Sequence, residues 1–291
     1  MEVREAVRTY VPGDAFLAVG GMHMHNAPMA LVREVIRQAI PVQTLATSPS
    51  AGIQADLPIG AGLVREVVCS YIGFEHLGLA PSFRRMAESG RLAVREGDEA
   101  LITHGYRAGA AGVPFLPLPD GVGETDVPAL NPEDYRASTD PFTGRPVTCI
   151  RALCPDVALV HCQKVDAFGN GILEGSAFTD IDMAKAAKAV IVQCEEVVPN
   201  EYVRAHAERV RLPGFLVDAV VAVPFGCHPT SSHRYYRADE EHLREYLAAA
   251  KEDVAPYVKK YVTGPRDHEA YLEAIGGRAR VDALLEPRPP W

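Results

Sequence analysis

Short apolar runs alternate with amphipathic patterns along most of the chain. This alternation is typical of an α/β fold built on an open, mainly parallel sheet flanked by helices, and we predict that class here. The strand candidates, in chain order, are Ala15–Gly21, Gln43–Thr47, Glu66–Ile72, Arg91–Arg95, Val147–Arg151, Val157–His161, Ala189–Gln193 and Phe215–Val223.

Helix boundaries are indicated at several places between these strands. Pro28 suits a first helical turn, where its missing N–H is not needed. Residues 82–88 end at a Ser-Gly pair that predicts a C-cap. Residues 179–182 have the pattern of a capping box for a helix that runs to about residue 188. Residues 98–111 form a weaker helical pattern because two glycines interrupt it.

The domain organisation follows from what interrupts the pattern. No Ser/Gly/Pro-rich linker or charge run divides the 291 residues, so we predict one domain over 1–291. Residues 114–146 are rich in Pro, Gly and Asp and predict a long loop excursion, a kind of segment that is often functional. Residues 239–291 predict a C-terminal helical region appended to the sheet or to a neighbour.

Composition narrows the functional classes. The formal net charge of −9 disfavours nucleic acid as a partner, because nucleic-acid binders concentrate Lys and Arg. No apolar stretch approaches the roughly 18 residues of a membrane span, and the first residues lack the apolar core of a secretory signal. The six cysteines show no C-x-x-C spacing and predict buried thiols in a reducing compartment. We therefore expect a soluble, cytoplasmic protein without a membrane partner.

The turn from Gly20 to Pro28 is the most informative local feature. A strand, two glycines and a helix start in succession can bring backbone N–H groups close to a ligand. A tight turn without a ligand explains the pattern equally well. His23 and His25 form an H-x-H pair, but no further ligands stand at metal-binding spacing, so we predict no metal site.

Catalytic motifs of the common α/β enzymes are missing from the sequence. There is no G-x-S-x-G nucleophile elbow, no G-x-x-x-x-G-K-[ST] phosphate loop and no G-x-G-x-x-G fingerprint. Among the carboxylates, Glu99 belongs to a cluster directly after a predicted strand, where open α/β sheets build their sites. A solvated helix N-terminus explains this cluster as well.

Seven segments together resemble the α subunits of family I CoA-transferases, the glutaconate CoA-transferase group among them. The resemblance extends from Gly13 to about Gly277. The segments are PGDAFLAVGG (12–21), SYIGFEHLG (70–78), GVPFLP (112–117), DPFTGRPV (140–147), CPDVALVH (154–161), VDAFGNG (165–171) and VDAVVAVPFGCHP (217–229).

This resemblance implies an α/β subunit that pairs with a similarly folded β subunit, in an α2β2 or larger assembly, with the active site in the cleft between them. In such enzymes a β-chain glutamate attacks the acyl-CoA and becomes a glutamyl-CoA thioester, so the nucleophile is expected on the partner. The coenzyme A thioester is a substrate, and no tightly bound cofactor is expected. The pocket walls of this chain are then Gly20, Gly21, His23, Asn26, Ser48, Ser50, Gly73, Phe74 and Glu75.

Two departures keep other functions open. Members of the family commonly have a glycine where this chain has His23, which implies a reshaped acyl pocket. At Glu99 the chain resembles α subunits of ring-cleaving CoA-ester hydrolases, which use an α-chain glutamate as base. The alternatives to transfer are therefore a CoA-ester hydrolase with Glu99 as general base, and a non-catalytic acyl-CoA-binding module.

Overall fold

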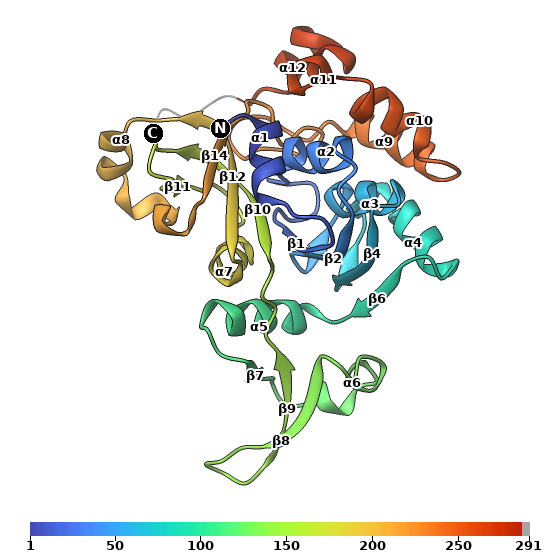
Figure 1. Cartoon of the computed structure of the whole chain (residues 1–291), viewed down its shortest axis with the longest axis vertical. Coiled ribbons are helices and arrows are strands. Elements are labelled where there is room, and N and C mark those ends of the chain that lie inside the picture. Colours follow the sequence, from blue (N-terminus) through green and yellow to red (C-terminus); the bar gives the residue numbers. More distant parts are fainter. Residues whose placement is uncertain (287–291) are drawn as a thin grey trace.

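The computed structural model describes residues 1–286, in which a nine-stranded sheet lies between two layers of helices (Figure 1). Along the order β14-β12-β10-β1-β2-β4-β6 every neighbouring pair of strands is parallel. The predicted open, mainly parallel α/β sheet is therefore confirmed. These strands are β1 (Ala15–Val19), β2 (Val42–Thr47), β4 (Val64–Cys69), β6 (Ala93–Glu96), β10 (Val157–Val165), β12 (Ala189–Val197) and β14 (Ala219–Ala222).

The sheet has both faces buried because its central strands are apolar at successive positions rather than at alternate ones. In β10, Val157 and Leu159 pack into one apolar cluster, while Ala158 and Val160 pack into a second cluster on the opposite face. The first face is covered by helices α1 (Val3–Tyr10), α2 (Met29–Arg37) and α3 (Ile53–Gly60) and by the C-terminal helices. The second is covered by α5 (Glu99–Ala110) and α7 (Asp180–Ala186).

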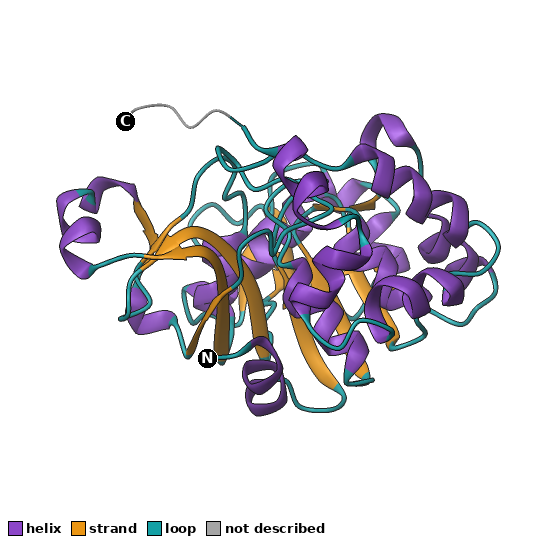
Figure 2. Cartoon of the chain, turned by 90° about the horizontal axis from the view of Figure 1, so that it is seen from above, coloured by secondary structure: helices purple, strands orange, loops and turns teal. Residues whose placement is uncertain are grey.

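The C-terminal region is helical, as predicted, and packs against the first face. Figure 2 shows most helices gathered toward the right of the view, beside the curved sheet. The elements are α9 (Glu240–Ala250), α10 (Ala255–Val258), a π-helical turn (Lys259–Thr263), α11 (His268–Ala274) and α12 (Gly277–Leu284). Residues 287–291 of the predicted region lie outside the described residues.

The segment 114–146, predicted as a long loop excursion, contains regular secondary structure. It contains β7 (Phe115–Pro117), α6 (Val127–Leu130) and β8 (Tyr135–Thr139). The two strands flank β9 (Pro146–Arg151) in a separate antiparallel sheet, which projects from the main body beyond α5 (Figure 1). The strand predicted at 147–151 exists, but it belongs to this small sheet. The strand pattern of this segment is weak because the segment is rich in proline and its strands are short. These strands also pair with each other and not with the buried sheet.

Other differences are local. The predicted strand 66–72 is divided into β4 and β5 (Tyr71–Ile72), and β5 pairs with β3 (Ser50–Ala51). The strand predicted at 215–223 shortens to β14, because a 3-10 turn occupies 214–216. The sequence did not predict β11 (Gly171–Ile172) and β13 (Val210–Leu212), which extend the sheet with antiparallel pairing, nor α8 (Asn200–Ala205).

Helix ends follow the sequence signals only in part. Ser89 is the C-cap of α4 (Pro81–Glu88), as predicted. Asp98 caps α5 by accepting the Leu101 N–H at 2.9 Å. The predicted capping box at Thr179 is wrong, because its hydroxyl donates to Ser48 Oγ at 3.0 Å and does not bond its own helix. A tertiary partner has replaced the local one.

Two features can be compared with the predictions of buried thiols and of no membrane-spanning segment. All six cysteines are free, and five are buried, whereas Cys154 is exposed and departs from the prediction of buried thiols. Among residues 1–286, no helix is long and apolar enough to cross a membrane.

Asp56 joins the C-terminal region to the body of the fold. Its buried carboxylate accepts the backbone N–H groups of Ser82 at 3.3 Å and Phe83 at 2.6 Å, in the first turn of α4. The hydroxyl of Tyr246, on α9, donates to the same carboxylate at 2.6 Å. One side chain therefore satisfies donors from two helices that lie far apart in the sequence.

We expect Asp56→Ala to lower the free energy of unfolding by about 3 kcal/mol or more, because three buried donors lose their acceptor. Tyr246→Phe removes one of those bonds and should cost about 1 kcal/mol. Urea denaturation of the two variants and the wild type measures both values. Equal losses in the two variants would show that Asp56 does not hold α4 as described.

Candidate functional site at the carboxyl edge of the sheet

The turn after β1 lies at the topological switch point of the sheet. β1 is paired with β10 on one side and with β2 on the other. The helix after β1, α2, covers one face, while α7, after β10, covers the other. Open α/β sheets bind ligands at such a point, outside the carboxyl ends of the strands. The position of the turn therefore favours a ligand-binding site. The sequence pattern of the turn alone left that question undecided.

Gly20 and Gly21 are required by close packing at this point. The Gly20 N–H donates to the Leu159 carbonyl at 2.8 Å, and the Gly21 N–H donates to Asp180 Oδ1 at 2.7 Å. A Cβ on Gly20 would overlap that same carboxylate oxygen, and Gly21 has a φ of +83°. Asp180 is 2% exposed, and its burial raises the pKa to about 6.

The backbone N–H groups of the turn are directed inward and bond within the protein. Besides the two glycines, His23 donates its N–H to the Ser50 carbonyl at 2.9 Å, and Asn26 donates to the Ser231 carbonyl at 2.8 Å. The sequence left open whether these groups approach a ligand or only form a tight turn. In the structure they make the turn rigid, so any ligand here meets a shaped wall and side chains.

His23 is the side chain of the turn that keeps unused hydrogen-bonding capacity. Its Nδ1 is buried and has no hydrogen-bond partner within residues 1–286, while the side chain as a whole is 21% exposed. Glu75 Oε1 lies 3.8 Å from that nitrogen. Both residues have positive φ, 49° for His23 and 50° for Glu75, a conformation that costs a non-glycine residue about 1 kcal/mol or more. The fold holds this pair in place against local strain.

Asn26 is fully engaged, and its partners come from distant elements. Its Nδ2 donates to the Glu174 carbonyl at 2.9 Å, and its Oδ1 accepts from Gln163 Nε2 at 2.9 Å. His25 is exposed, and its Nδ1 lies 2.7 Å from Ser231 Oγ. Its pKa is lowered, mainly by partial burial. Asn26 therefore positions the turn and is not free to bind a ligand.

The other predicted wall residues divide into two groups. Ser50 contacts the turn through its carbonyl, and Gly73 donates its N–H to the Ala51 carbonyl at 2.9 Å. Ser48 is fully buried and accepts the Thr179 hydroxyl, which makes it part of the interior. Phe74 is also fully buried, with its ring 5.7 Å from that of Tyr246. We therefore assign Phe74 to the apolar core.

Glu99 lies at the same edge of the sheet but away from the turn. It is exposed and is the first residue of α5, directly after β6. β6 is separated from β1 by β2 and β4, which corresponds to about 14 Å across the sheet at ~4.8 Å per strand. The helix N-terminus suggested by the sequence is present, and Glu99 faces solvent there.

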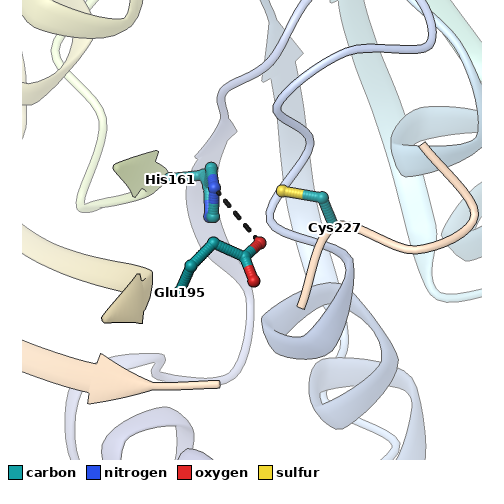
Figure 3. Close-up of side chains that lie close together, drawn as sticks. All are labelled: His161, Glu195 and Cys227. Carbon is teal, nitrogen blue, oxygen red and sulfur yellow. Dashed lines mark ion pairs between the residues drawn. The ribbon is translucent and has the colours of Figure 1, made fainter. Parts of the chain in front are cut away.

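A buried polar cluster lies close to the turn, and the sequence reasoning missed it. His161 on β10, Glu195 on β12 and Cys227 have ligand atoms within 4.8 Å of one another (Figure 3). Glu195 accepts the Tyr236 hydroxyl at 2.6 Å and the Phe225 N–H at 2.7 Å. A signal was present: polar residues at alternate positions of two apolar strands, namely His161, Gln163, Gln193 and Glu195.

The cluster is connected to the turn through shared hydrogen bonds. Gln193 Nε2 lies 3.3 Å from His161 Nδ1, and His161 Nε2 lies 3.1 Å from Ser232 Oγ. Gln163 Nε2 reaches both Ser232 Oγ, at 3.3 Å, and Asn26 Oδ1. A continuous path of buried polar groups therefore runs from this cluster to the turn.

Burial sets the protonation of this cluster. It lowers the pKa of His161 to about 3 and raises the pKa of Glu195 to about 7, and it raises the pKa of the Cys227 thiol. His161, Glu195 and Cys227 are donor types that bind Zn²⁺. An ion would have to displace the hydrogen bonds that His161 and Glu195 already make, so the arrangement fits a neutral hydrogen-bonded network better than a metal centre.

Another hollow of the described chain lies away from the turn. A cavity of about 450 Å³ lies against the small sheet, lined by residues such as Phe115, Asp134, Arg136 and Ile150. Charged residues line it, but it does not lie at the switch point, and Asp134 in its wall is paired with Arg95. We therefore place the candidate site at the turn, where topology and unsatisfied polar capacity coincide.

The raised pKa of Glu195 has a consequence for stability. The folded protein holds the Glu195 proton more tightly than the unfolded chain, so stability falls as pH rises from about 4.5 to about 7. Glu195→Gln cannot ionise, and its free energy of unfolding relative to wild type should improve over that interval by an amount of order 3 kcal/mol. Denaturant melts at several pH values test this, with Glu196→Gln, at the adjacent half-buried position, as the control. A difference between Glu195→Gln and wild type that does not change with pH would contradict it.

Known proteins resemble this chain in both sequence and fold. One subunit of the glutaconate CoA-transferase of Acidaminococcus fermentans is 31% identical over 304 residues, which cover 99% of this chain and 95% of that protein. The crystal structure of glutaconate coenzyme A-transferase from the same organism superposes with a TM-score of 0.91 at 32% identity, covering 99% of this chain and 95% of that one.

A relative with a different name is also similar. The cholesterol ring-cleaving hydrolase IpdA subunit of Rhodococcus jostii is 34% identical over 86% of this chain and 88% of its own length. The coenzyme A transferase family model matches residues 1–223, which includes the whole parallel sheet and the turn at its switch point. The chain belongs to the coenzyme A transferase family.

Proposed function

We propose that this chain is the α-type subunit of an enzyme that moves coenzyme A between carboxylic acids, with a β subunit completing the active site. Two observations support it: the similarity to a glutaconate CoA-transferase over nearly the whole chain, and the half-site at the switch point. The glutaconate and 3-oxoadipate CoA-transferase relatives are each named as one subunit of their enzyme, which supports a partner subunit for this chain. We place the two in an α2β2 or larger assembly.

The observation that carries the proposal is the arrangement of side chains around the turn at the switch point, which we call the half-site. At the turn, Asp180 is buried and holds the Gly21 N–H, and Glu195 is buried within its network. Neither carboxylate is accessible to attack a thioester. The partly exposed Glu75 lies next to His23 instead. This wall can therefore shape a pocket, and we assign the attacking carboxylate to the partner because of the similarity to glutaconate CoA-transferase.

In the proposed reaction a glutamate of the partner attacks the thioester carbonyl of the acyl-CoA and expels the CoA thiolate, forming an acyl-glutamyl anhydride. The thiolate then attacks the glutamyl carbonyl and releases the first carboxylic acid. The resulting glutamyl-CoA thioester is resolved by the acceptor carboxylate in the reverse sequence. Here the turn of this chain positions the acyl group, and coenzyme A thioesters are substrates, with no tightly bound cofactor required.

Covalent trapping tests this proposal. We expect borohydride treatment of the complex with acyl-CoA to reduce a glutamyl thioester on the partner, which mass spectrometry of the separated subunits would locate. The same complex without acyl-CoA is the control. Turnover of acyl-CoA without an adduct on either polypeptide would count against transfer.

The second candidate is hydrolysis with Glu99 as general base, and its exposure at the carboxyl edge makes it accessible to water. Glu99→Gln separates the two functions, because transfer by a partner glutamate needs no base on α5. We expect transfer by Glu99→Gln to stay within about two-fold of wild type, well under the 10²-fold or more that general-base loss costs. A collapse of turnover in Glu99→Gln would favour the hydrolase.

His23 should govern which acyl group is accepted. His23→Gly relieves the strain of its positive φ, so the variant should fold, while the imidazole beside Glu75 is lost. We expect the ratio of the kcat/KM values of two competing carboxylic acids to change by about ten-fold in this variant. A change of that size is what one altered contact in a pocket produces. His206→Gln, at the C-terminal end of α8, is the matched control. Unchanged ratios in His23→Gly would remove His23 from the acyl pocket.

A further inference from the structure

Arg33 is a buried positive charge to which the described chain offers only neutral partners. It lies on α2 and is 2% exposed. Its NH1 donates to the His228 carbonyl at 2.7 Å, and its guanidinium carbon lies 3.7 Å from the centre of the Tyr271 ring. Its NH2 lies 3.3 Å from His268 Nδ1. Burial lowers the pKa of Arg33, the direction expected when the charged form is poorly solvated.

His268 does not supply a negative charge. Its Nε2 lies 2.8 Å from the Pro224 carbonyl, so that nitrogen carries the proton, and Nδ1 can accept from Arg33. Burial lowers the pKa of His268 to about 3, which leaves the ring neutral at ordinary pH. The three partners of Arg33 are therefore a carbonyl, an imidazole lone pair and an aromatic face.

Two nearby buried carboxylates, Glu34 and Asp239, are already committed to other cations. Glu34, the next residue on α2, forms an ion pair with Arg37 and also accepts from Gln38. Asp239 bonds Arg280 and His228. A buried charge without a counter-ion is unfavourable by several kcal/mol. Within residues 1–286 that counter-ion is missing.

A cleft of about 470 Å³ borders Arg33 and could hold an external anion. Its walls also include the basic residues Arg4, Arg37 and Arg266 and the acidic residues Glu2, Glu34, Asp267 and Glu269. Glu34 is paired with Arg37 and Asp267 with Arg266, while Glu2 and Glu269 lie exposed. The mixed charge of the walls suits a small anion better than a polyanionic surface. A planar guanidinium binds phosphate or carboxylate oxygens through two parallel hydrogen bonds.

The geometry points to an oxyanion site at Arg33 that takes a phosphate group, either free phosphate or a phosphate of a larger ligand such as coenzyme A. The cleft is bordered by Ala222, Val223 and Pro224, at the carboxyl end of β14, so it opens at the same edge of the sheet as the turn. With free phosphate as its ligand the site is independent of the proposed transfer reaction, whereas with a phosphate of coenzyme A it rests on the proposed function.

Occupancy of this site would also affect the turn. The His228 carbonyl held by Arg33 belongs to the same loop as Ser231, whose carbonyl accepts the Asn26 N–H. The Ala30 N–H, at the start of α2, donates to the Gly226 carbonyl of that loop at 2.8 Å. The loop is therefore bonded to Arg33 at one end and to the turn at the other.

Calorimetric titration of the full chain with inorganic phosphate tests the site. We expect one phosphate per chain and a Tm raised by about 4 °C at a hundred-fold excess over Kd. Arg33→Met should lose both effects, and Arg33→Lys should bind more weakly because the planar fork is lost. Arg278→Met removes an exposed arginine of α12 and should behave as wild type. Equal phosphate responses of wild type and Arg33→Met would overturn the proposal.

Two further measurements keep the test decisive. If Arg33→Met does not fold, the NMR signal of the Arg33 Nε–H in the wild type should shift on phosphate addition, and an unchanged signal overturns the site. Competition with coenzyme A and dephospho-coenzyme A then identifies the source: displacement of phosphate by coenzyme A alone assigns its 3′-phosphate, and displacement by neither assigns free phosphate. If phosphate no longer binds once the β subunit is present, a carboxylate of that partner is the true counter-ion and the oxyanion site is rejected.

Discussion

The close approach of the Gly20-Gly21 turn to Asp180 is the contact on which the candidate site depends. It joins the first βα unit to the N-terminus of α7, on the opposite face of the sheet, at the switch point. Because the carboxylate is buried, it is held by backbone N–H groups and not by solvent. A glycine is needed at position 20 since a side chain would occupy the space of the carboxylate oxygen.

With the backbone of the turn committed to internal bonds, the functional character of this edge comes from side chains. His23 and Glu75 are placed there by strained backbone, and such strain persists only where the surrounding structure enforces it. Asn26, by contrast, is held from three directions and acts as an anchor. The chain therefore contributes a rigid wall with one adaptable imidazole, which suits half of a cleft whose chemistry is completed by a second polypeptide.

Behind this wall, the segment after β14 connects several buried polar systems. It supplies Cys227 and Ser232 to the network around Glu195, Ser231 to the turn and His228 to Arg33. Shared hydrogen bonds hold these groups in place, and Gln193 Oε1 is left without a hydrogen-bond partner among residues 1–286. The cluster of His161, Glu195 and Cys227 therefore supports the turn from within the fold.

From the sequence alone, the pattern of apolar residues and glycines predicts the class of fold, its mainly parallel strands and the turn after β1, because burial on both faces and tight turns leave such a local pattern. The family follows from the resemblance of seven segments to known subunits. The sequence did not determine which strands pair. The pattern predicts a loop where β7 and β8 form a small sheet with β9, and it predicts a helix cap at Thr179, whose hydroxyl bonds Ser48 instead. Only the tertiary structure brought Glu195 to His161 and Arg33 to the cleft, and only there did the turn prove to be satisfied internally. The physical reason is that a buried polar group bonds whichever partner the packed chain places within reach. Some of these partners are more than two hundred residues apart in the sequence.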